Sequence, residues 1–136
     1  FQVLWAIGAS MMIMSALVWL PRSAIAAIAL ILIAGHNALD AVKVNVFDGW
    51  DWKEVAWMVW HQEGFLPFGD GAPLAGLVLR YPLMPWIGLM AAGYALGPIF
   101  LWESARRQRF LLLGAGLLLL VFVLLRSANL YGDPWT

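Results

Sequence analysis

Four long apolar stretches, separated by polar segments, make up most of this chain of 136 residues. They cover residues 1–20, 23–42, 82–102 and 110–126. A helix needs about 20 apolar residues to cross a hydrocarbon layer roughly 30 Å thick. The pattern therefore predicts an all-α integral membrane protein, in which residues 1–136 form one transmembrane region of four helices.

The one long connection, residues 43–81, contains a helical pattern of its own at residues 51–62. One face of that helix would carry Trp52, Val55, Ala56, Val59 and Trp60. Asp51 is suited to cap its start. We expect a short amphipathic helix at the membrane surface, within an aromatic belt. The turn-rich residues 64–73 that follow should be irregular.

Two features of the third stretch concern helix packing. Gly88 and Ala92, like Gly93 and Gly97, are small residues four positions apart. Such pairs let helix backbones approach closely in lipid, although loose packing without a specific partner explains them equally well. Pro98 should kink the helix, because it lacks a backbone N–H.

Composition narrows the class further. Hydrophobic residues make up 63% and charged residues only 12%, whereas soluble domains carry about 25% charge. The formal net charge is zero, which gives no basic surface for nucleic acid. Because the chain has no cysteine and only two histidines, without HExxH spacing, we predict no disulfide and no metal site.

Arginines and lysines suggest an orientation. Arg22 and the group Arg106, Arg107 and Arg109 fall on one side of the predicted membrane; Lys43, Lys53, Arg80 and Arg126 fall on the other. The group of three lies in a very short connection, where the positive-inside rule is strongest. We therefore expect this side to be cytoplasmic, with residues 43–81 and the C-terminus outward. Arg126 should reach the interface from a short fourth span.

His36 and Asp40 are the leading candidates for chemistry. They are four residues apart near the outer end of the second stretch, so they share a helical face. A carboxylate that holds one imidazole nitrogen can orient the ring for general-base work. Ionisable groups are costly in lipid, which makes them functional candidates. The alternative is a polar helix end that is paired for structural reasons.

The candidate substrate-binding residues all lie on the predicted outer side. They are Asn37, His61, Arg80, Asn129, Tyr131 and Asp133. His61 ends the surface helix, where a lone histidine is more often simply solvated. Arg80 has the alternative of reaching lipid phosphates. The three clustered arginines, besides setting topology, are able to attract the phosphates of a cytoplasmic cofactor.

Four segments in order resemble the bacterial branch of the heparan-α-glucosaminide N-acetyltransferase-like membrane proteins. They are GHNALD, HQEGF, YPLMPWIGLMAAGYALG and RSANLYGDPW, at residues 35–40, 61–65, 81–97 and 126–135. The resemblance extends over nearly the whole chain. It implies a larger multi-pass protein of the bacterial inner membrane, of which this chain forms the middle to later helices. Its partners would be lipid and the remaining helices or a partner membrane chain, with a homo-oligomer as an option.

The resemblance also implies an activity, which is transfer of an acetyl or acyl group from cytoplasmic acetyl-CoA to a sugar or cell-envelope acceptor. Two departures matter. The family's LDxLRG-type segment, which precedes its catalytic histidine, is absent, so His36 and Asp40 are given only supporting roles. HQEGF also replaces the more typical HQPGF. A transporter-like segment, with protons relayed by His36 and Asp40, and a structural subunit of a larger complex remain the alternatives.

Overall fold

The structure is a computed structural model that describes residues 2–44, 51–67 and 76–129. Its chain forms two compact units, Phe1–Ala95 and Leu96–Thr136. Two of the proposed binding residues, Tyr131 and Asp133, lie outside the described residues.

Apolar helices dominate, as the sequence predicts. The first unit contains α1 (Gln2–Leu17) and α2 (Arg22–Gly35), which continues into the 3₁₀ turn η1 (His36–Leu39). Pro21 separates α1 from α2 in an extended conformation. The remaining long helices are α4 (Leu83–Leu96), followed by the 3₁₀ turn η2 (Gly97–Leu101), and α5 (Ser104–Ser127).

Within the described residues, three segments are long and apolar enough to cross a membrane: Arg22–Leu39, Leu83–Leu101 and Ser104–Ser127. The first predicted span forms a shorter apolar helix, Val3–Leu17. In the third, the α-helix gives way to the 3₁₀ turn where Pro98 removes a donor. The structure is therefore mostly helical, and the apolar helices are compatible with a lipid bilayer.

The fourth span differs from its prediction. α5 has 24 residues, so it is not short, and the group Arg106, Arg107 and Arg109 lies inside the helix and not in a connecting loop. Arginine is a good helix former, so a change from apolar to charged residues does not end a helix. None of the residues of α5 is buried within the described part of the chain.

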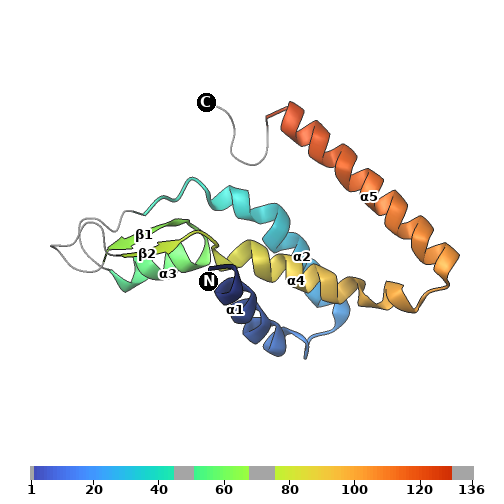
Figure 1. Cartoon of the computed structure of the whole chain (residues 1–136), viewed down its shortest axis with the longest axis horizontal. Coiled ribbons are helices and arrows are strands. Elements are labelled where there is room, and N and C mark those ends of the chain that lie inside the picture. Colours follow the sequence, from blue (N-terminus) through green and yellow to red (C-terminus); the bar gives the residue numbers. More distant parts are fainter. Residues whose placement is uncertain (1, 45–50, 68–75, 130–136) are drawn as a thin grey trace. The chain divides into compact units, whose positions relative to one another are not determined.

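α1, α2 and α4 pack through alanines and larger apolar side chains. One buried cluster joins Met14, Ile25, Ala29 and Ala91, and a second joins Ala6 to Leu83 and Ile87. At Gly88, an added Cβ would lie 3.0 Å from Leu32 Cβ and from Ile33 Cγ1, so α4 approaches α2 closely there. Figure 1 shows these helices in blue, cyan and yellow. A Cβ added at Gly93 or Gly97 would meet no atom of a neighbouring element within 4 Å in the described part of the chain, so close helix approach is found at Gly88 and not at the Gly93–Gly97 pair.

A helix, α3 (Trp52–Trp60), forms within the segment where the sequence predicts an amphipathic one. Its N-cap is Asp51, whose Oδ1 accepts a hydrogen bond of 3.1 Å from the Lys53 backbone N–H. The buried face is shifted from the expected one, because Met58 is buried and packs with Leu66 and Leu79. Trp52 and Trp60 are exposed instead.

A two-stranded antiparallel sheet lies beside α3 (Figure 1), where we expected irregular structure. β1 (Gly64–Pro67) pairs with β2 (Gly76–Leu79), and Phe65 is opposite Val78. Its inner side chains, Leu66 and Leu79, bury themselves against α3. The prediction of a turn-rich segment was therefore wrong for β1, because burial against a helix stabilises a strand that has little alternation of its own.

Candidate functional site

A hydrogen-bonded contact between His61 and Asp40 joins the end of α3 to the end of η1, the 3₁₀ turn that continues α2. His61 Nε2 lies 3.1 Å from Asp40 Oδ1. Asp40 is the C-cap residue of η1, and His61 is the C-cap residue of α3, so two separate elements bring the groups together. The His61 side chain is 5% exposed and that of Asp40 is 47% exposed. The pair thus has one buried and one accessible member.

The chemistry of the two side chains determines which of them donates the hydrogen bond. An ionised carboxylate only accepts, so Nε2 of His61 must donate to Asp40. In a neutral ring the lone pair is then on Nδ1. That nitrogen is buried and has no hydrogen-bond partner in the described part of the chain. The ring of Trp57 covers His61 at a centroid distance of 5.3 Å and an interplanar angle of 57°.

Gln62 holds the irregular segment that follows Asp40. The side-chain Oε1 of Gln62 accepts a hydrogen bond of 2.9 Å from the backbone N–H of Val44. Its Nε2 donates one of 2.9 Å to the backbone carbonyl of Val44. Trp57 Nε1 adds a bond of 3.2 Å to the carbonyl of Val42. We call Trp57, His61 and Gln62 the α3 clasp. It holds residues 40–44 against the end of α3.

His36 has a different partner from the one expected. Its Nδ1 lies 2.8 Å from the carbonyl oxygen of Ile33. Since a carbonyl only accepts, Nδ1 donates, and the lone pair of a neutral ring is on Nε2. Asp40 contacts His61 and not His36. The expected shared face is lost because residues 36–39 form a 3₁₀ turn, in which residues three apart, and not four, are aligned.

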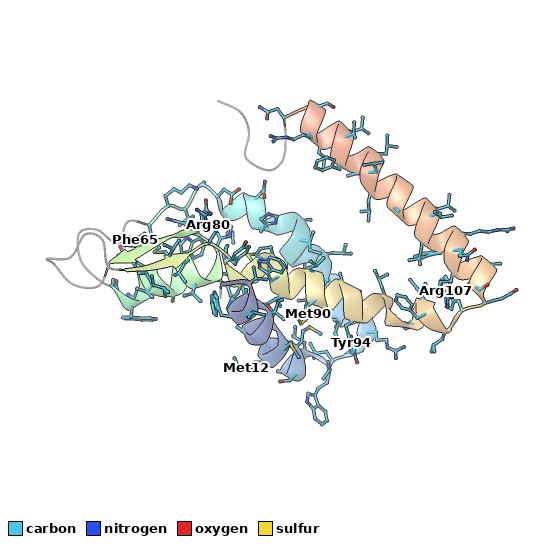
Figure 2. The ribbon with its side chains drawn as sticks, in the orientation of Figure 1. Met12, Phe65, Arg80, Met90, Tyr94 and Arg107 are labelled. Atoms are coloured by element: carbon cyan, nitrogen blue, oxygen red, sulfur yellow. The ribbon has the colours of Figure 1, made fainter. Side chains whose placement is uncertain are left out.

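The remaining candidates are spread over the chain. Asn37 is half-buried in η1, where its backbone carbonyl accepts a hydrogen bond from the backbone N–H of Asp40. Arg80 is exposed just after β2 (Figure 2). Asn129 lies in the second unit and has a positive φ of 53°. The structure therefore brings together Asp40 and His61 from the predicted set.

Sequence reasoning missed Trp57 and Gln62 as parts of this site. The signal was present, because Gln62 directly follows His61 in the HQEGF segment. Its carboxamide offers both a donor and an acceptor, as a backbone segment requires. The described residues contain no group of three histidine, cysteine, aspartate or glutamate side chains arranged to hold a metal ion.

Helices of membrane-spanning length, one of them followed by Asp40 in contact with the buried His61 of α3, are the features of a helical membrane protein. A family model described as "Heparan-alpha-glucosaminide N-acetyltransferase, catalytic" matches residues 1–130. The chain belongs to this family, and the resemblance seen in the sequence is confirmed. No curated protein and no solved structure matches the chain. Its function is accordingly that of a membrane acetyltransferase-like protein.

Proposed function

We propose that the full-length protein transfers an acetyl or acyl group from a cytoplasmic thioester, acetyl-CoA, to a sugar or cell-envelope acceptor. The match of the catalytic family model over residues 1–130 is the observation that carries this proposal. A polar pair at the end of a candidate span supports it. Catalysis there would occur where a polar acceptor meets the membrane.

The membrane arrangement that goes with this function has four spans, with the shorter α1 as the first. α3 and the hairpin connect the end of α2 to the start of α4, so they lie on one side of the membrane. The exposed rings of Trp52 and Trp60 suit the headgroup region. We place this side outward in the bacterial inner membrane, and Arg22 with the three clustered arginines inward.

The proposed acetyl donor, acetyl-CoA, carries charged phosphates. α5 has cationic side chains near its start. The guanidinium of Arg106 lies 4.3 Å from the ring centroid of Trp102. Arg107 Nη1 donates a bond of 3.1 Å to the carbonyl of Phe100. Glu103 is the N-cap residue of α5, and the first turn itself carries no acidic residue. These guanidinium groups fit the phosphates of a coenzyme A thioester, since arginine binds phosphate by charge-assisted hydrogen bonds.

The reaction itself requires a proton balance. The acceptor amine or hydroxyl attacks the thioester carbonyl carbon, a C–N or C–O bond forms, and the C–S bond breaks. The proton lost by the acceptor ends on the departing thiolate. Asp40 and His36 are the proposed supporting acid–base groups. Asn37, His61, Arg80, Asn129, Tyr131 and Asp133 are the proposed substrate-binding residues.

A direct assay tests the proposal. Purified full-length protein is given acetyl-CoA and glucosamine, and the acetylated sugar and free thiol are quantified. We expect both products in equal amounts, and at least a tenfold lower rate for Asp40→Asn, since a positioned acid or base contributes about 10²–10⁴-fold. Glu63→Gln, which removes an exposed carboxylate outside the Asp40–His61 pair, serves as the matched control. If no acetylated product forms, and the same protein in sealed proteoliposomes shows glucosamine flux without acetyl-CoA, the result would instead indicate a transporter.

A further inference from the structure

The two members of the Asp40–His61 pair differ in their access to a ligand. The side chain of Asp40 is 47% exposed, whereas that of His61 is 5% exposed. We propose that the Asp40 carboxylate binds the N–H or O–H groups of the acyl acceptor, and that His61 is a positioning residue that acts through Asp40. This inference rests on the proposed function, and it changes the role of His61 from ligand contact to support.

Asp40 retains capacity for a ligand. A carboxylate has two oxygens that together accept about four hydrogen bonds. Within the described residues, its side chain accepts one bond, from His61 to Oδ1. Oδ2 therefore remains able to accept from an amine or hydroxyl. A hydrogen bond to a charged group is stronger than one between neutral groups.

His61 is itself held in place on several sides. Its backbone N–H donates a bond of 2.7 Å to the carbonyl of Trp57. The neighbouring Gln62 fixes the segment beyond Asp40 by its two bonds to Val44. These hydrogen bonds, together with the contact between Nε2 of His61 and Oδ1 of Asp40, tie the end of α3 to residues 40–44. A group whose rotamer is fixed by its surroundings binds a ligand with a smaller loss of entropy.

The other ring nitrogen supports an indirect role. Nδ1 of His61 has less than 1 Å² of accessible surface and no hydrogen-bond partner among the described residues. The polar contact made by the ring is the one from Nε2 to Asp40. The influence of His61 on a ligand therefore passes through the carboxylate. The competing explanation is that the α3 clasp only stabilises the fold. In that case, removing the His61 hydrogen bond would not change the affinity for the acceptor.

A double-mutant cycle separates these explanations, because it measures whether two residues act through each other. The full-length variants His61→Phe, Asp40→Ala and the double variant are assayed with acetyl-CoA and increasing glucosamine. Phenylalanine keeps a ring but removes the donor. We expect His61→Phe and Asp40→Ala each to raise the KM for glucosamine by about tenfold or more, the effect of one charged hydrogen bond. In the Asp40→Ala background, His61→Phe should add no further increase.

His61→Gln is the rescue variant, because its amide nitrogen can occupy the position of Nε2 and donate to Asp40. We expect its KM to stay within about threefold of the wild type, a small fraction of the energy of a charged hydrogen bond. Equal effects of His61→Phe with and without Asp40 would overturn the inference, as would an unchanged KM in His61→Phe. Unfolding midpoints of all variants are recorded. If His61→Phe fails to fold, the comparison of His61→Gln with Asp40→Asn decides.

Binding without catalysis distinguishes this inference from the proposed function. Glucosamine binding to the full-length protein is measured by calorimetry in the absence of acetyl-CoA. Binding that is lost in Asp40→Ala and weakened in His61→Phe supports the inference even if no acetylated product forms, which would refute the proposed function alone. If the wild type and all variants form acetylated product with equal KM for glucosamine, the inference alone is overturned. Absence of both binding and product overturns both.

Discussion

Gly88 provides a strict test of the packing that positions the end of α2. It lies on α4 where that helix approaches α2. The perturbation is Gly88→Ala, and the matched control is Gly93→Ala on the same helix. An added Cβ at Gly93 meets no atom within 4 Å in the described part of the chain.

The magnitude follows from the local distances. At Gly88 the new Cβ would lie 3.0 Å from Leu32 Cβ and from Ile33 Cγ1, and 3.4 Å from the backbone nitrogen of Ile33. A Cβ and a backbone nitrogen move only with α2 itself, so the two helices must separate slightly. Overpacking of this kind costs about 1–3 kcal/mol. Both variants gain about 1 kcal/mol of helix propensity, which cancels in the comparison.

We therefore expect Gly88→Ala to be about 1–3 kcal/mol less stable than Gly93→Ala. Equilibrium unfolding of the full-length protein by increasing SDS in mixed micelles measures this difference. Because both variants add the same methyl group to the same helix, micelle binding and helix propensity are matched. Equal unfolding free energies for the two variants would show that α2 and α4 are not in close contact at Gly88.

Three further substitutions test the elements around the site, each by unfolding or exchange measurements on the full-length protein. Gln62→Ala should cost about 1–3 kcal/mol, because two hydrogen bonds to the backbone are lost; Gln62→Asn should not restore them, since it is one methylene shorter. Gly76→Ala should increase amide exchange throughout β1 and β2, because its Cβ would collide with the ring of Phe65; unchanged exchange contradicts the pairing. Asp51→Ala should cost about 0.5–2 kcal/mol by loss of the N-cap of α3, whereas Asp51→Asn should cost less.

The helices were predictable because their causes are local. Long apolar runs define α2, α4 and α5, and an aspartate at the position of a cap defines the start of α3. Their ends were less predictable. At Pro98 the α-helix changes to a 3₁₀ turn. α5 begins at Ser104 and includes the three arginines, although the hydropathy pattern predicted a start only at residue 110. Propensity decides such ends, and hydrophobicity does not.

The site was only half predictable, because its key contact is not local. Asp40 and His61 are 21 residues apart in the sequence. A pattern at spacing four favoured His36 as the partner of Asp40, but the 3₁₀ turn at residues 36–39 misaligns them. The pairing of β1 with β2 was missed for a similar reason, since register between strands depends on burial against α3 and not on either strand alone.

The central claim, acyl transfer across the membrane through this site, is tested most directly in sealed proteoliposomes of the full-length protein. Acetyl-CoA is supplied on the side of Arg106 and Arg107, and glucosamine on the side of Asp40. The account predicts acetylated sugar in the glucosamine compartment and free coenzyme A in the other, both strongly reduced by Asp40→Asn. Acetylated sugar that forms only when both substrates share one compartment, or that Asp40→Asn leaves unchanged, would contradict it.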